Sequence, residues 1–422
     1  MKDKNELLKK LAVNGGEKTI TVPFPGRKHF GKEEQEAADA IFKKCIETGN
    51  ATGYNGAEED MYCKAFSEFM GGGYTDGVNS GTTSVYVALK ALNPEPFTEI
   101  IVGSVTDPGG MMPIPLLNCI PVIADSEPGR YNTGPAEIEK LISPLTSAIV
   151  VAHIGGEPAD IEGIIKIAKK KGIPVVEDCS QSHGARINGK PVGSFGDIAA
   201  FSTMFGKHHC TGGQGGAVFT KDEELYWKIR RAADRGKPFN LPAGSTNCVA
   251  SLNYNLNDLA AAIGTVQVKK LPGIIKRRQE FAETLKKKGL KDLKSIIIPS
   301  LIKGAEHSYW WWRLEVNEKV LNCTKAEFCK ALQAEGVALN PSYMAALPHT
   351  MEWYKNRSVF GTSQLPWSSP MYKGDANRKF ECSNALDTCA KQFNLNVSES
   401  WGGAEAELIV KAFKKVEDAY LK

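Results

Sequence analysis

The amino-acid sequence predicts an α/β fold in which helices cover both faces of a mostly parallel sheet. Several helical patterns, such as ADIEGIIKIAKKKG, separate short apolar runs that show no polar alternation. These runs are Ile100 to Val102, Ile120 to Ala124, Ala148 to Ala152, Val175 to Val176, Ala199 to Ser202 and Ala217 to Thr220. Continuous apolar strands that alternate with helices are typical of a parallel sheet buried on both faces.

The chain is long enough for two domains. A single hydrophobic core rarely supports 422 residues. After the predicted helix DLAAAIGTVQVKKL the composition shifts towards lysine, and an aromatic strand pattern, HSYWWWRLEV, follows. We therefore expect a lead over residues 1–18, a large domain over 19–271 and a smaller α+β domain over 272–422.

Composition and charge exclude several classes of protein. The net charge of +4 is spread through helices and forms no basic stripe, so we expect no nucleic-acid partner. The ten cysteines form no CxxC pair, which favours free thiols in a reducing compartment over a disulfide framework. No apolar run approaches the ~18 residues of a membrane span, and the N-terminus has no apolar signal region. We expect a cytoplasmic protein without a membrane partner.

A carboxylate, a hydroxyl and an amine follow predicted strands. Asp178 ends VVED, Ser202 ends AAFS, and Lys207 comes shortly afterwards in FSTMFGK. Ligands of open α/β sheets bind beyond the carboxyl ends of the strands, so we expect these three residues on one rim. Taken alone, a strand-end aspartate also suits a helix cap, and a loop lysine is usually a solvated surface charge.

The context of Lys207 points to pyridoxal phosphate (PLP) chemistry. The loop TGGQGG, which permits close backbone packing, follows soon after the lysine. A carboxylate for a pyridinium nitrogen, an amine for a Schiff base and a compact loop are the parts that a PLP enzyme needs. His208 and His209 have no partner at a spacing that suits a metal, so we expect no metal site.

A helix start rich in hydroxyl groups lies at Asn79 to Thr83. Unpaired N–H groups and the helix dipole make such a start suitable for a phosphate. Serine and threonine also serve as simple N-caps, and the sequence leaves both interpretations open.

Five segments together resemble the DegT/DnrJ/EryC1/StrS family of PLP-dependent sugar aminotransferases. They are VVAHIGGEPADI, VVEDCSQSHGA, GSFGDIAAFS, GKHHCTGGQGGAVFT and LNYNLNDLAAAIGTVQVKKL. The resemblance runs from about Thr19 to the C-terminus, with order and spacing preserved across the large domain. It implies the type I PLP-dependent transferase fold, with a mostly parallel seven-stranded sheet, and PLP as the cofactor.

The resemblance also implies roles for individual residues. Lys207 matches the Schiff-base lysine, which also shuttles the proton, and Asp178 matches the aspartate paired with the pyridine nitrogen. Gln181 matches a polar side chain near the cofactor hydroxyl. The phosphate cradle is matched by Thr82, Thr83 and Ser202.

Two further matches concern the partner subunit and the substrate. Asn253 matches an asparagine that reaches the phosphate of the neighbouring subunit, which implies a homodimer with shared active sites. His307 matches a histidine near the sugar end of the site, and His208 is a second candidate for substrate contact.

Three features depart from the family pattern. Asp107 stands where an aromatic residue usually stacks on the cofactor ring, and a carboxylate cannot stack. Asn255 replaces the arginine of the family motif NYRM. The aromatic-rich segment from Met351 to Phe380 has no clear counterpart in the motifs.

One alignment ambiguity decides between two reactions. Counting forward from GDI puts Lys207 at the lysine position, whereas counting backward from the GG pair puts His208 there. Related dehydratases carry histidine at this position. The extra glycine in the loop favours Lys207, and therefore transamination.

The sequence thus predicts an aminotransferase that moves an amino group from glutamate or glutamine to a keto sugar, nucleotide-linked or phosphorylated, or to a related polyol. The alternatives are a sugar dehydratase that uses His208 and a non-catalytic PLP-binding regulatory protein. A nicotinamide dehydrogenase is disfavoured because no GxGxxG follows a predicted strand.

Overall fold

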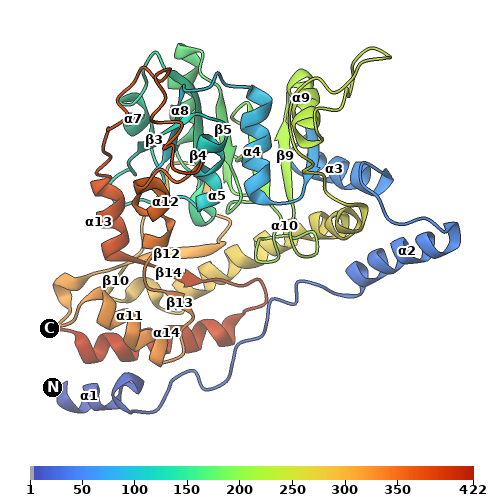
Figure 1. The fold of residues 1–422 in the computed structure, drawn as a ribbon. Coiled ribbons are helices and arrows are strands. Elements are labelled where there is room, and N and C mark those ends of the chain that lie inside the picture. Colours follow the sequence, from blue (N-terminus) through green and yellow to red (C-terminus); the bar gives the residue numbers. More distant parts are fainter. Residues whose placement is uncertain (1–3) are drawn as a thin grey trace.

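A seven-stranded sheet forms the centre of the large domain (Figure 1). The computed structural model describes residues 4–422. Strand β9 pairs antiparallel with both of its neighbours, and the other pairs are parallel, which confirms the predicted mostly parallel sheet. In spatial order the strands are β1 (Tyr74–Val78), β9 (Gly216–Thr220), β8 (Ile198–Ser202), β5 (Val175–Asp178), β4 (Thr146–Ala152), β2 (Glu99–Gly103) and β3 (Ile120–Ala124).

Helices cover both faces of this sheet because successive strand residues point to opposite sides. Ile100 and Val102 of β2 pack in the core beneath α4 (Gly81–Leu92) and α9 (Glu223–Ala233). Ile101 packs on the other face with α7 (Pro135–Glu139) and α8 (Ile161–Lys171). That second face continues under α3 (Ala57–Phe69). Two short helices, α5 (Pro108–Met111) and α6 (Pro113–Leu116), connect β2 to β3.

A single long helix, α10 (Asp258–Lys287), runs from the large domain into the C-terminal region. Its early residue Val268 packs with α3, whereas Phe281 and Leu285 belong to the C-terminal hydrophobic core. The predicted domain boundary at Leu271 therefore falls inside a continuous helix, and the division at that residue stays a prediction.

The C-terminal region has an antiparallel sheet of its own with helices packed on it. The strand order is β10 (Ile296–Ile297), β12 (Trp311–Val316), β14 (Gln392–Asn396) and β13 (Leu339–Asn340). Helices α11 (Lys325–Ala334) and α14 (Gly403–Tyr420) complete the core, in which Ile409, Phe413 and Val416 of α14 are buried. The elements α12 (Glu352–Lys355) and α13 (Ser383–Lys391) lie between β13 and β14 in the chain.

The N-terminal lead joins this C-terminal core. Helix α1 (Lys4–Lys10) contacts α14, and Leu11 and Ile20 are buried among the core side chains. Helix α2 (Lys32–Thr48) then packs against α10, and Glu34 of α2 pairs with Lys270 of α10 at 2.8 Å.

A small third sheet contains a tight Asn-Gly turn. Strands β6 (Arg186–Ile187) and β7 (Lys190–Pro191) form a hairpin that also pairs with β11 (Ala305–Glu306). Its turn residues Asn188 and Gly189 have φ values of 51° and 76°, as the Asn-Gly pair predicts.

The ten cysteines all carry free thiols. Among residues 4–422, no helix is both long and apolar enough to cross a membrane.

Candidate active site

A cavity of about 210 Å³ lies beyond the carboxyl ends of the central strands. Asp178 ends β5, Ser202 ends β8, and Lys207 follows β8 by five residues, and all three line the cavity. The structure thus brings the predicted carboxylate, hydroxyl and amine together on one rim. Thr82 and Gln181 also line this cavity.

The start of α4 forms one wall. The Ser80 hydroxyl accepts a hydrogen bond from Thr83 N–H at 3.2 Å, and the Thr83 hydroxyl donates to the Asn79 side chain. Thr83 is therefore part of the helix cap and does not line the cavity, whereas its neighbour Thr82 does. The first N–H groups of a helix have no partner within the helix, which leaves this end suited to an anion.

Glycines bring the backbone close to the cavity wall. A Cβ atom on Gly81 would lie 2.4 Å from the side chain of Ser202, and one on Gly110 would lie 2.9 Å from a carboxylate oxygen of Asp178. Both positions therefore require glycine if the wall is to keep this shape.

Lys207 is buried, with 7% of its surface exposed. Burial lowers the pKa of its amine from 10.5 to about 8, against the opposing charges of Asp178 and Asp107. The amine lies 3.9 Å from the centroid of the Trp310 ring. Among residues 4–422 it forms no ion pair within 4.0 Å, so it is available for chemistry in the cavity.

Asp178 is equally buried. Burial raises the pKa of its carboxyl group, while hydrogen bonds from Ser180 and the charge of Lys207 act in the opposite direction. One carboxylate oxygen accepts the Ser180 N–H at 3.0 Å. No cation of the described chain pairs with it within 4.0 Å, which leaves this carboxylate free to pair with a cationic ligand group.

Gln181 is held in position by two hydrogen bonds. Its side-chain oxygen accepts the Gly155 N–H at 2.8 Å, and its amide donates to the Tyr343 hydroxyl at 3.1 Å. Tyr343 follows β13 in the chain, so a residue of the C-terminal half supports a side chain of the cavity wall.

His208 lies away from the cavity although it follows Lys207 directly. Its side chain is fully buried, and its Nε2 lies 3.1 Å from the Ser308 carbonyl oxygen. Its neighbour His209 contacts Tyr62 at 3.2 Å and His183 at 3.1 Å inside the protein. Of the two residues in the alignment ambiguity, Lys207 is the one whose side chain reaches the cavity.

Two other predicted residues lie elsewhere. His307 does not line the cavity, because its ring is buried and stacks on Tyr309 with centroids 4.1 Å apart. The predicted substrate contacts of His307 and His208 therefore have no basis in the geometry of this chain. Asn253 is exposed and does not line the cavity of its own chain.

A buried ionic network fixes the backbone on both sides of Lys207. Glu399 pairs with Arg27 at 3.0 Å and with Arg278 at 2.7 Å. Arg27 donates to the Lys207 carbonyl at 2.8 Å, and Arg278 donates to the carbonyl of Tyr309, beside Trp310, at 2.7 Å. Burial alone raises the pKa of Glu399, but a hydrogen bond with His29 and the charges of both arginines hold it at about 2.

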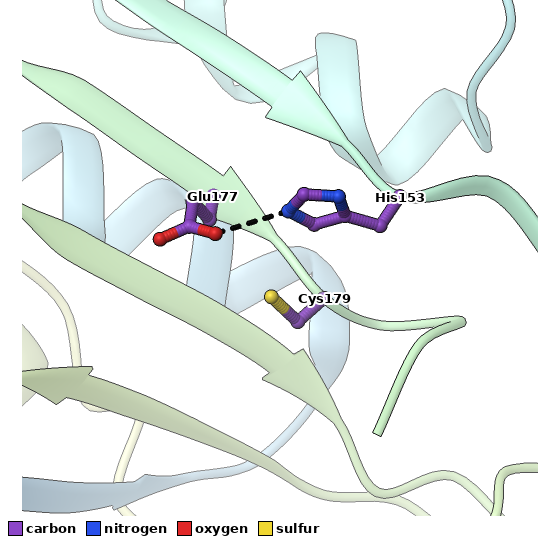
Figure 2. Close-up of side chains that lie close together, drawn as sticks. All are labelled: His153, Glu177 and Cys179. Atoms are coloured by element: carbon purple, nitrogen blue, oxygen red, sulfur yellow. Dashed lines mark hydrogen bonds and ion pairs between the residues drawn. The ribbon is translucent and has the colours of Figure 1, made fainter. Parts of the chain in front are cut away.

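Beside Asp178, a second buried cluster joins His153, Glu177 and Cys179 (Figure 2). His153 Nε2 lies 3.0 Å from Glu177, and its Nδ1 accepts the Ala159 N–H. The Glu177 oxygens also accept three backbone N–H groups, those of Gly193, Phe195 and Gly196. Burial raises the pKa of the Cys179 thiol well above its ordinary value. Metal ligands must be deprotonated and have a free lone pair, so these contacts indicate a structural brace at the ends of β4 and β5.

The sequence over residues 32–377 matches the DegT/DnrJ/EryC1/StrS aminotransferase family. The chain belongs to this family. Its members are PLP-dependent enzymes, and this aminotransferase is one of them. The matched range takes in most of the segment from Met351 to Phe380, for which the motifs gave no counterpart.

Individual relatives agree with this assignment. The aminotransferase is 29% identical over 280 residues to a GDP-perosamine synthase of Caulobacter vibrioides, which covers 66% of this chain and 74% of that protein. It is 30% identical over 378 residues to the spore coat polysaccharide biosynthesis protein SpsC of Bacillus subtilis, a match that covers 83% of this chain and 94% of that protein. An aminotransferase structure from Psychrobacter cryohalolentis has the same fold, with a TM-score of 0.81, 24% identity and coverage of 92% and 98%.

The cavity of the aminotransferase fits PLP. An anion-binding helix end, an uncompensated buried carboxylate and a buried amine with a lowered pKa surround one space, and glycines keep the walls clear. These groups are suited to the phosphate, the ring nitrogen and the aldehyde carbon of the cofactor, respectively.

The sequence interpretation missed several residues of this site. Trp310 and Tyr343 come from segments far from Lys207 in the chain, and no local pattern marks them as site residues. Asp107 lines the cavity as expected, but it caps α5 by accepting the Gly109 N–H at 2.9 Å. Gln214 also lines the cavity, and its position within TGGQGG was the available signal.

Proposed function

We propose that this aminotransferase transfers an amino group from glutamate or glutamine to the keto group of a sugar that is linked to a nucleotide or phosphorylated. The main support is that Lys207 and Asp178 share one small cavity with the start of α4. The similarity to a GDP-perosamine synthase and to a polysaccharide biosynthesis protein supports the sugar class.

Lys207 is the proposed catalytic base. With a pKa of about 8, roughly a tenth of the amine is neutral at pH 7, and the neutral form is the one that abstracts a proton. In the donor half-reaction its Nζ accepts a proton from the α-carbon of the amino acid. In the acceptor half-reaction the same group moves a proton in the opposite sense.

Asp178, Ser202 and Thr82 hold the cofactor in this proposal. When bound, PLP supplies an electron sink for the negative charge that develops at the α-carbon. The carboxylate of Asp178 keeps a positive charge on the ring nitrogen favourable, and the α4 start with the two hydroxyls binds the phosphate. Gln181 positions the ring edge, since Gly155 and Tyr343 fix its orientation.

A second copy of the chain completes the site in this proposal. Large apolar side chains on and near α2 are exposed, among them Ile46 at 82% and Phe42 at 56%. Leu252, next to Asn253, is also exposed. A homodimer would cover these side chains and bring Asn253 to the phosphate of the partner's cavity.

A half-reaction assay tests the base assignment. Lys207→Ala should lower the rate of amino transfer from glutamate or glutamine by at least a hundredfold, which is the usual contribution of a positioned base. Borohydride treatment of the wild-type holoenzyme should fix the cofactor on the peptide that contains Lys207. The matched variant His208→Gln keeps a donor near the Ser308 carbonyl and should lose less than about tenfold.

Retention of full transfer by Lys207→Ala, with loss in His208→Gln, would contradict the assignment. Binding of PLP without any half-reaction would instead support a non-catalytic role. The return half-reaction with a panel of keto sugars identifies the acceptor.

A further inference from the structure

A larger cavity of about 630 Å³ lies at the edge of the central sheet. Its floor is Ile120, Pro121 and Val122 of β3, which is the edge strand. Its walls come from residues 349–380, the stretch around α12 that lies on the β3 side of the molecule (Figure 1). We call this cavity the β3-edge pocket. It shares no lining residue with the active-site cavity.

The walls of the β3-edge pocket are firmly anchored. Tyr372 donates a hydrogen bond to the buried carboxylate of Glu99 at 2.8 Å. Trp367 and Tyr372 are buried against Ile120, and Tyr354 packs edge-to-face on Trp367 with centroids 5.8 Å apart. The pocket is therefore a built feature with aromatic walls.

The charge of the pocket is strongly positive. The lining includes four cationic side chains, Lys355, Arg357, Arg378 and Lys379, and one carboxylate, Asp375. Within residues 4–422 none of the four cations lies within 4.0 Å of a carboxylate. Arg357 lies 5.8 Å from the Trp367 ring, and Arg378 lies 5.3 Å from the Phe380 ring. The Arg357 guanidinium donates to the Ala376 carbonyl, but neither arginine has a carboxylate partner in the described part of the chain. Guanidinium groups whose charge is not neutralised, beside aromatic faces, suit a ligand with both negative charge and a planar ring.

A buried polar atom also lacks a partner at this pocket. His349 lines it with only 9% of its surface exposed, and its Nδ1 has no hydrogen-bond partner in the described chain. Buried polar atoms are usually hydrogen-bonded, so this ring nitrogen is available to a polar group of a ligand in the pocket.

We propose that the β3-edge pocket binds a nucleoside diphosphate or the nucleoside diphosphate part of a larger molecule. The four cations match a ligand with at least two negative charges, and the aromatic walls match a base. A volume of about 630 Å³ lies within the range of small-molecule sites, about 300 to 1,000 Å³. This binding site is separate from the amino-transfer cavity and does not depend on the proposed reaction.

Calorimetric titration of the holoenzyme at low salt tests the proposal. GDP and UDP are the probes, and guanosine and inorganic pyrophosphate represent the two halves of the ligand. At least one diphosphate should bind more tightly than either half, and its affinity should fall as salt screens the charges. The double variant Arg378→Ala/Lys379→Ala should weaken binding tenfold or more. Both side chains are exposed, so the fold should survive the change.

Lys373→Ala is the matched control. Lys373 is exposed on the same segment but does not line the pocket, and its amine donates to the Pro370 carbonyl. The affinity of the Lys373→Ala protein for the diphosphate should stay within twofold of wild type.

Hydrogen exchange locates the bound nucleotide. Protection should concentrate in residues 349–380, whereas protection confined to 204–216 would mean binding in the active site and overturn the proposal. The proposal is also overturned if the double variant binds like wild type, if neither diphosphate binds below millimolar concentration, or if pyrophosphate or guanosine alone binds as tightly. Loss of amino transfer with retained binding here would contradict only the proposed reaction.

Discussion

The rate at which the apoenzyme captures PLP should report the ionisation of Lys207. Only the neutral amine attacks an aldehyde, so the capture rate is proportional to the neutral fraction. With a pKa of about 8, roughly 9% of Lys207 is neutral at pH 7, against about 0.03% for an amine at the ordinary value of 10.5. Burial should thus accelerate capture at pH 7 by about 300-fold relative to an unperturbed lysine.

Asp107→Asn tests the electrostatic part of this reasoning. Asp107 raises the pKa of Lys207, so removing its charge should lower that pKa and increase capture at pH 7. The increase cannot exceed about tenfold, because the neutral fraction only rises from roughly 9% towards unity. At pH 10 the two proteins should react equally. Asparagine still accepts the Gly109 N–H, so the cap of α5 is kept.

Stopped-flow measurement of cofactor capture between pH 6 and pH 10 supplies the profile. Asp292→Asn, a change at an exposed residue of the C-terminal region, is the control and should leave the profile unchanged. A wild-type midpoint above about pH 9.5, or slower capture at pH 7 in Asp107→Asn, would refute the reasoning.

Two further predictions concern the buried ionic network next to Lys207 and the wall of the active-site cavity. Glu399→Gln leaves Arg278 buried without its carboxylate, which should destabilise the fold by about 3–5 kcal/mol in denaturant unfolding. The pKa of Glu399 is about 2 in the folded protein and 4.5 ordinarily, so its charge stabilises the fold fully above pH 4.5, and this stabilisation is lost as the pH falls towards 2. If wild type and Glu399→Gln lose the same free energy of unfolding in acid, this reasoning is wrong. Gly81→Ala places a methyl group 2.4 Å from Ser202 and should weaken PLP binding at least tenfold in equilibrium dialysis, whereas Gly403→Ala, with open space around it, should bind like wild type.

Much of the large domain could be predicted because its signals are local. The apolar runs became strands of the sheet, and the Asn188-Gly189 pair became a hairpin turn. Asp178 and Lys207 lie where strand ends in a parallel sheet must meet, so their common cavity follows from the order of elements.

The sequence could not predict which of two adjacent side chains faces the cavity. Thr82 lines the cavity and Thr83 caps the helix, because consecutive residues of a helix point about 100° apart. Lys207 and His208 are separated by the conformation of a loop that Arg27 holds from the N-terminal segment. No periodic pattern encodes such a conformation.

The sequence by itself determined the family, the α/β sheet and the pair Asp178 and Lys207, since strand patterns and motif order are properties of short segments. Only the tertiary structure decided that Lys207 rather than His208 reaches the cavity, that Trp310 covers its amine and that His307 lies apart. It alone also brought residues 349–380 to the edge of β3. The positions of Lys207, His208 and Trp310 depend on contacts between residues about 100 positions apart in the chain, because packing there fixes the direction of each side chain.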